Sequence, residues 1–90
     1  MDKKKLEQLR TMLDETHTWP TMFMFKFIVP SDEKKISTLK LIFGESAEFT
    51  PKLSKKGNYT SITIKDIMLS ADAIFERYTE AAKIEGIISL

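Results

Sequence analysis

The stretch from Thr21 to Val29 constrains the fold of this chain more than any other. It reads Thr-Met-Phe-Met-Phe-Lys-Phe-Ile-Val and is bracketed by Pro20 and Pro30. Apolar side chains occupy both alternations of the stretch, and Lys26 is its single charge. A strand of this kind belongs inside a sheet whose two faces are both at least partly covered. The pattern therefore predicts a central strand and locates the core, but it does not indicate a biochemical task.

Composition narrows the class of protein. A chain of 90 residues with 42% apolar and 30% charged residues is typical of one small globular domain. The net charge of +1 creates no strong field toward nucleic acid or membranes, and the lack of cysteine excludes disulfides and thiolate metal sites. No apolar run reaches the roughly 18 residues of a membrane span, and the Met-Asp-Lys-Lys-Lys start lacks the apolar core of a signal peptide. We expect a cytoplasmic protein without a membrane association.

Apolar periodicity predicts three helices and three further strands. Ser31 and Ser70 are suited to cap the second and third helices, and Gly44 to end the second. Pro51 cannot donate a ladder hydrogen bond, so its strand is expected at a sheet edge. Two predicted helices span 3–15 and 71–84, and the helix between them is predicted to start within Pro30-Ser31-Asp32-Glu33 and to stop at Gly44. The predicted strands span 21–29, 46–53, 59–65 and 87–90.

The order of these elements predicts an α+β fold. After the first helix, two βαβ halves joined by a hairpin give a ferredoxin-like βαββαβ sandwich. Right-handed crossovers then imply an antiparallel sheet in the order 4-1-3-2, with two helices on one face. This order puts the apolar first strand in the middle and the Pro51 strand at an edge. We divide the chain into an N-terminal helical extension, residues 1–17, and a ferredoxin-like domain, residues 18–90.

The second face of this sheet needs a cover. If Phe23, Phe25 and Phe27 face the helices, the alternate side chains of two strands face outward, and that surface is too apolar to be left wet without a reason. Three occupants fit the pattern: the N-terminal helix with its Leu6, Leu9 and Leu13 stripe, a second copy in a homodimer, or a ligand. The helix is the leading expectation. The outward set comprises Met22, Met24, Lys26, Ile28, Tyr59, Ser61, Thr63 and Lys65.

No set of residues points to catalysis, a metal or a cofactor. The single histidine, His17, lies between the first helix and the first strand and is interpreted as a solvated linker residue. Trp19 is interpreted as a plug where this helix meets the sheet, and an exposed aromatic for recognition of a partner is the alternative. There is no glycine-rich phosphate loop, and metal binding would need scattered carboxylates. The sequence therefore predicts a protein that is not an enzyme.

The charge distribution offers one alternative. From Lys52 to Lys65 the chain has four lysines and no acid, with Lys55 and Lys56 at the tip of the predicted hairpin. A solvated turn accounts for this pattern, and a grip on RNA or phosphate is the alternative. RNA-recognition motifs share the fold and stack bases on aromatic side chains of the open face. Here Tyr59 is the one aromatic of the third strand, so nucleic acid is the less favoured partner.

Four segments, residues 19–21, 25–28, 54–64 and 84–88, resemble the YbeD-like family of small bacterial proteins (domain of unknown function family 493). The most specific part is the hairpin Ser-Lys-x-Gly-x-Tyr-x-Ser-Ile-Thr over residues 54–63. The resemblance implies a ferredoxin-like fold close to ACT regulatory domains, which bind small effectors, and a bacterial cytoplasmic protein. It implies no catalytic residue. Residues 2–16 form a longer lead-in than is typical of the family.

Together these patterns favour a non-enzymatic regulatory or adaptor module that binds a partner protein or a small effector. The alternative is an RNA- or phosphate-binding module that uses the basic hairpin. The candidate binding residues are Met22, Met24, Lys26, Ile28, Lys52, Lys55, Lys56, Tyr59 and Lys65.

Overall fold

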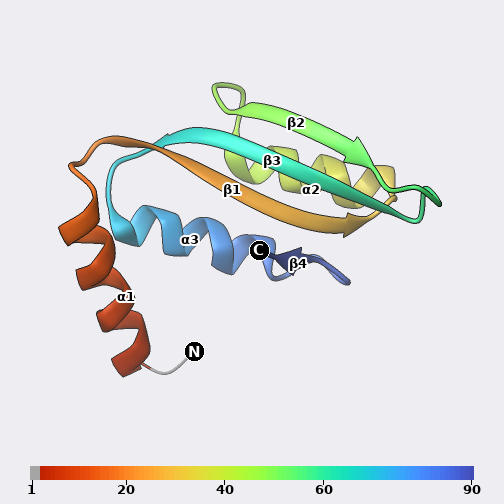
Figure 1. Ribbon diagram of the computed structural model, residues 1–90. Helices are drawn as coiled ribbons and strands as arrows, with labels where there is room; N and C mark the ends of the chain where they lie inside the picture. The colour runs from red at the N-terminus through yellow and green to blue at the C-terminus, as the bar shows by residue number, and fades with distance from the viewer. Residues whose placement is uncertain (1–2) are drawn as a thin grey trace.

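The computed structural model describes residues 3–90 and shows three helices and four strands (Figure 1). The elements follow one another along the chain as α1 (Lys3–Thr16), β1 (Thr21–Pro30), α2 (Glu33–Phe43), β2 (Glu48–Leu53), β3 (Tyr59–Met68), α3 (Ala71–Ala81) and β4 (Ile88–Ser89).

The four strands form one antiparallel sheet in the order β2-β3-β1-β4. This is the predicted order, and it is consistent with the ferredoxin-like arrangement. β1 and β3 pair along their whole length, from Thr21 opposite Met68 to Pro30 opposite Tyr59. The apolar stretch is therefore an inner strand, as predicted from the apolar side chains at both its odd-numbered and its even-numbered positions.

β2 lies at an edge of the sheet, as Pro51 predicts. The backbone nitrogen of Ser54 donates to the carbonyl of Tyr59 (2.9 Å), so even-numbered residues of β2 direct their backbone groups toward β3. Pro51 is odd-numbered, so its nitrogen points away from β3 and its missing proton costs no ladder bond. On the alternation of β2 that faces the helices, Phe49 is half-buried, whereas Pro51 and Leu53 are exposed.

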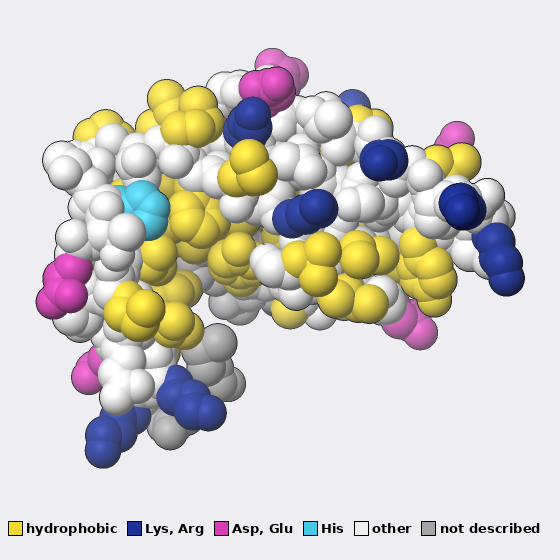
Figure 2. Space-filling view, in the orientation of Figure 1, with side chains coloured by type: hydrophobic (Ala, Val, Ile, Leu, Met, Phe, Trp, Pro, Cys, Tyr) yellow, Lys and Arg dark blue, Asp and Glu magenta, His cyan; other side chains and the backbone are white. Residues whose placement is uncertain are grey.

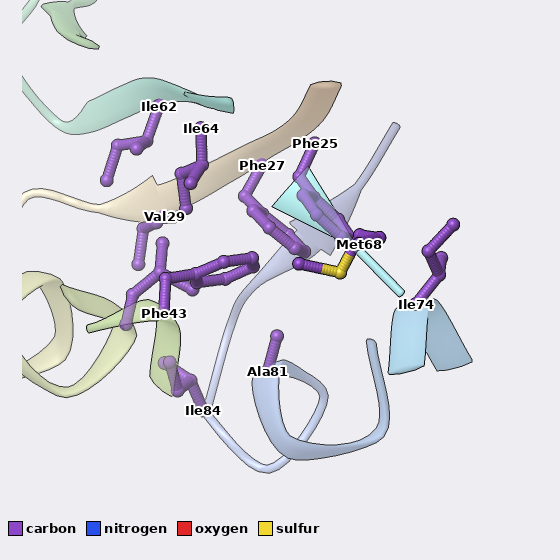
Figure 3. Close-up of a cluster of buried hydrophobic side chains, with 11 residues drawn as sticks. Phe25, Phe27, Val29, Phe43, Ile62, Ile64, Met68, Ile74, Ala81 and Ile84 are labelled. Carbon is purple, nitrogen blue, oxygen red and sulfur yellow. The ribbon is translucent and has the colours of Figure 1, made fainter. Parts of the chain in front are cut away.

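The core lies between one face of the sheet and the helices α2 and α3 (Figures 1 and 3). Phe25 and Phe27 have no exposed surface, and both rings lie within 6.1 Å of the Phe43 ring between centroids. Each such side chain contributes about 2–3 kcal/mol to folding through the apolar area it buries. The inward set is completed by Val29, Leu39, Ile62, Ile64, Met68, Ile74, Ala81 and Ile84.

The helix boundaries confirm one predicted cap and correct the other. The Ser70 hydroxyl accepts a hydrogen bond from the Ala73 amide at 3.1 Å, so Ser70 caps α3 as expected. At α2 the cap is Asp32, whose carboxylate accepts from the Lys34 amide at 2.8 Å. Ser31 instead shares a hydrogen bond with the Thr60 hydroxyl (2.9 Å). A carboxylate at the positive end of a helix dipole is at least as good a cap as a hydroxyl.

Two predicted boundaries move by several residues. β3 continues to Met68 rather than ending at Lys65, because its alternation of inward and outward side chains persists through Asp66. Asp66 lies on the inward-facing alternation of β3 and is buried. Its carboxylate has a hydrogen-bond partner there, because it accepts from the Ile67 amide at 2.9 Å. α3 ends at Ala81 rather than residue 84, and Ile84 belongs to the turn that leads to β4.

α1 does not cover the open face of the sheet, and this leading expectation is wrong. The helix lies on the side of α3, where Arg10 pairs with Asp72 at 2.7 Å and Leu13 packs against the core (Figure 1). Its C-terminal end is held by Trp19, whose indole N–H donates to Asp14 at 2.9 Å and whose ring packs against the core. His17 is half-buried and stacks on Trp19 at 5.6 Å, so it is not a solvated linker residue.

Candidate functional site

The open face of the sheet is the surface on which most predicted binding residues meet. Residues directly opposite one another in an antiparallel pair share a face. Met24 lies opposite Lys65, and Lys26 lies opposite Thr63. The predicted face assignment is therefore confirmed: the phenylalanines of β1 point to the helices and the methionines point away. We call this surface the open face.

Its apolar side chains are substantially solvated. Met22 and Met24 are 58% and 55% exposed, and Tyr59 is 48% exposed. Ile28 is half-buried, and Ile88 of β4 lies opposite it with 51% exposure. Solvated apolar groups contiguous over three strands are typical of an interaction surface.

Lysines are placed among these apolar groups. Lys26, Lys52 and Lys65 come from three different strands, and register places all three on the open face. Glu48 is the one acid that the strand register of residues 3–90 places on this face. Within residues 3–90 none of the three lysines lies within ion-pair distance of an acid. Figure 2 shows this face, with dark-blue basic side chains spread across the strands between yellow apolar ones. The result is an apolar surface with free positive charge.

Lys55 and Lys56 stand apart from the open face. They lie at the tip of the turn between β2 and β3, where both are exposed. Gly57 closes this turn with a φ of +76°, a conformation that favours glycine. The nine predicted residues therefore fall into two groups: seven lie on the open face, and two extend beyond its end.

The structure adds residues to the open face that the sequence analysis missed. Ile67 is 57% exposed and lies opposite Met22, and Glu48 lies opposite Lys65. Ile67 was missed because Asp66 looked like the end of the strand. The inward and outward alternation of β3 continues through Asp66 to Met68. A strand prediction that allowed one acid to face inward would therefore have placed Ile67 on the open face.

Within residues 3–90, no group of three or more histidine, cysteine, aspartate or glutamate residues is placed to hold a metal ion. In the same part of the chain, no helix has the length and apolar character needed to cross a membrane. A cavity of about 540 Å³ lies between α2 and β2, next to Lys40 and Phe49, and a groove of about 560 Å³ lies between α1 and α3.

The fold and the open face define a small α+β protein with an antiparallel sheet that is covered by helices on one side only. A model of the family described as "Protein of unknown function (DUF493)" matches residues 14–90. The chain belongs to this family, so the YbeD-like resemblance is confirmed. Most of α1 precedes the matched region, and the division at residue 17 stays a prediction.

Curated relatives are similar over most of the chain. A UPF0250 protein of Shewanella oneidensis is 35% identical over 83 residues, which cover 88% of this chain and 94% of the relative. UPF0250 proteins of Shewanella halifaxensis and Shewanella putrefaciens are 32% and 36% identical, with the same shares of each chain covered. No solved structure matches this chain.

Proposed function

We propose that this protein is a non-enzymatic adaptor or regulatory module of the bacterial cytoplasm, and that it docks a partner protein on its open face. The observation on which this rests is the uncovered patch of Met22, Met24, Tyr59, Ile67 and Ile88. Because α1 packs beside α3 instead, nothing within residues 3–90 shelters this patch. Solvated apolar area of this kind stabilises a complex when a partner removes it from water.

Charge indicates the chemistry of the partner. Lys26, Lys52 and Lys65 stand on the open face, and Glu48 is the one acid that the strand register of residues 3–90 places beside them. A second copy packed face to face would bring the same excess of lysines and would be repelled. An apolar surface with exposed acids would complement it, and such complementarity speeds association and excludes wrong partners. The partner that we propose is therefore a protein with an acidic, partly apolar surface, and the open face binds that surface.

The experiment uses a photo-crosslinking amino acid at position 24 of the full chain, in extract of the source bacterium. A matched probe at Leu41, which is 82% exposed on α2, reports non-specific capture. The proposal requires a protein that crosslinks at position 24 and not at position 41, and that binds the unlabelled chain after purification. Crosslinks only to a second copy, or to no protein, would overturn it.

Binding of that purified partner is then compared between variants. Met24→Asp should weaken binding by at least about tenfold, since it places a carboxylate where apolar contact is expected. Lys26→Glu together with Lys65→Glu should weaken it and reverse its salt dependence, because the open face then carries more acids than lysines and repels an acidic partner. Leu41→Asp should bind like the unaltered protein. Equal binding by all of these variants would place the partner elsewhere.

An RNA- or phosphate-binding function is the second candidate. The observation that favours it is the continuation of the lysines of the open face onto Lys55 and Lys56 at the hairpin tip. Against it, Phe25 and Phe27 are buried, so β1 offers no aromatic side chain to stack on bases from the open face. A titration with single-stranded RNA at increasing salt separates the candidates, because phosphate contacts give a steep salt slope. Absence of binding at low salt ends this alternative.

A further inference from the structure

One edge of the inner strand β1 is only partly paired. β4 pairs with β1 at Phe27 and Ile28, and the Leu90 amide donates to the Lys26 carbonyl at 2.9 Å. No strand within residues 3–90 pairs with the same edge between Thr21 and Phe25. Figure 1 shows β4 beside only part of β1.

The backbone groups on this edge can be identified. Along a strand, the N–H and C=O groups of successive residues point alternately to the two neighbouring strands. The Ser31 amide donates to the Asn58 carbonyl, so odd-numbered residues of β1 bond toward β3, whereas the Lys26 carbonyl bonds toward β4. The N–H and C=O groups of Met22 and Met24 therefore point to the unpaired side. Four backbone hydrogen-bonding groups stand there in the geometry that an added strand needs.

An apolar groove runs beside this edge. It has a volume of about 560 Å³, and Phe23 of β1 and Ser89 of β4 belong to its wall. Its other apolar side chains come from two helices, and Figure 2 shows apolar side chains gathered in the angle beside α1. They are Leu6, Leu9 and Leu13 of α1 and Ile74, Phe75, Tyr78 and Ala82 in and next to α3. The groove is where side chains on the helix-facing side of an added strand would enter.

From this juxtaposition we propose that β1 and the groove form a strand-addition site for an extended segment of a partner protein. The segment pairs antiparallel with Met22 and Met24, in line with β4, and continues the β1–β4 pairing already present at Phe27 and Ile28. Its residues opposite Phe23 and Phe25 point into the groove and are apolar. Main-chain bonds of this kind supply affinity, and alternate side chains supply specificity.

A lone segment suits this site better than a second copy does. The free length is about five residues, from Thr21 to Phe25, between the end of α1 and the start of the pairing with β4. A strand that belongs to a second sheet arrives with its own helices packed beneath it, at the place where the groove lies. A single extended chain needs only the width of one strand, which is about 5 Å.

The probe is a blocked pentapeptide, Leu-Thr-Leu-Thr-Lys, whose length matches the free stretch from Thr21 to Phe25. It is titrated into the ¹⁵N-labelled full chain and followed by NMR. In the free protein, the Met22 and Met24 amides should exchange with solvent faster than the Phe23 and Phe25 amides, which bond toward β3. Binding should protect the Met22 and Met24 amides and shift the resonances of residues that line the groove.

Two matched comparisons test the geometry. N-methylation of the threonine amides, which pair with Met22 and Met24, should weaken binding by at least about tenfold, since each methyl removes a hydrogen bond. N-methylation of the leucine amides, which point away from β1, should change binding by less than about threefold. In the protein, Leu9→Glu should weaken binding by at least about tenfold, and Leu41→Glu, at an exposed site on α2 that does not line the groove, should not.

Several results would overturn the proposal. They are no binding at millimolar peptide, equal effects of the two methylation patterns, shifts confined to the open face, or protection of Met22 and Met24 that grows with protein concentration alone. The last result would assign the edge to a second copy. Because Leu9 lies away from the open face, failure here leaves the proposed docking function of that face standing.

Discussion

The two edges of the sheet are protected in opposite ways. The β2 edge carries Pro51 with charged residues on both sides, Glu48 and Lys52, and is six residues long. These are the features by which natural sheets prevent pairing with other chains. The β1 edge from Thr21 to Phe25 has no proline and no charge, and its backbone donors and acceptors point outward. An edge left without protection, beside an apolar groove, is suited to receive another strand, whereas the protected edge is suited to water.

The prediction with the largest expected effect tests which residues of β2 direct their N–H groups toward β3. Thr50 directs its N–H toward β3, whereas Leu53 directs its N–H to solvent, and both side chains are exposed. Thr50→Pro should lower the free energy of unfolding by about 2–3 kcal/mol, because it breaks a ladder bond and leaves a carbonyl of β3 unpaired. Leu53→Pro should cost less than about 1 kcal/mol. Urea denaturation of both variants measures the difference, and equal losses would refute the assigned alternation.

A smaller effect is expected when the protection is exchanged between the edges. Pro51→Val with Lys52→Val gives β2 the character of an unprotected edge and should increase self-association at high protein concentration. Met24→Lys places a charge on the β1 edge and should reduce any self-association of the unaltered chain. Sedimentation velocity over a concentration series measures both. Stability should change by less than about 1 kcal/mol in each variant, so a large loss would mean that the association reflects unfolding.

The smallest effect concerns Tyr78, which lies in the wall of the groove. Burial raises the pKa of Tyr78 above its ordinary value of 10.0. The unfolded chain therefore loses this proton at a lower pH than the folded chain does, so stability is retained below about pH 10 and falls as pH rises beyond it. Tyr78→Phe should make this alkaline loss shallower, as measured by thermal melts from pH 9 to 11 (about the range of tyrosine ionisation).

Peptide binding gives a second test that involves Tyr78. Addition of the pentapeptide should raise the Tyr78 pKa further, because an occupied groove removes more water from the phenol. A Tyr78 titration that is unchanged by saturating peptide would place the peptide outside the groove.

The candidate site was predictable to the extent that it depends on strand alternation. Met22, Met24 and Lys26 were placed on the open face by parity with Phe25 and Phe27, and burial confirms that placement. Ile67 was missed because one inward acid, Asp66, interrupted an otherwise regular alternation. The groove was missed entirely, because its walls come from α1 and α3, and the sequence pattern of either helix shows an apolar stripe without showing what the stripe faces.

The sequence by itself determined the inner strand, the inward phenylalanines and the edge position of the Pro51 strand. These follow from local rules: period-two alternation, and a proline nitrogen that has no proton to donate. Only the tertiary structure decided where α1 lies and how little of β1 is covered by β4. An apolar stripe is stabilised against any apolar surface, and long-range contacts such as the Arg10–Asp72 pair and the packing of Leu13 and Trp19 select among those surfaces.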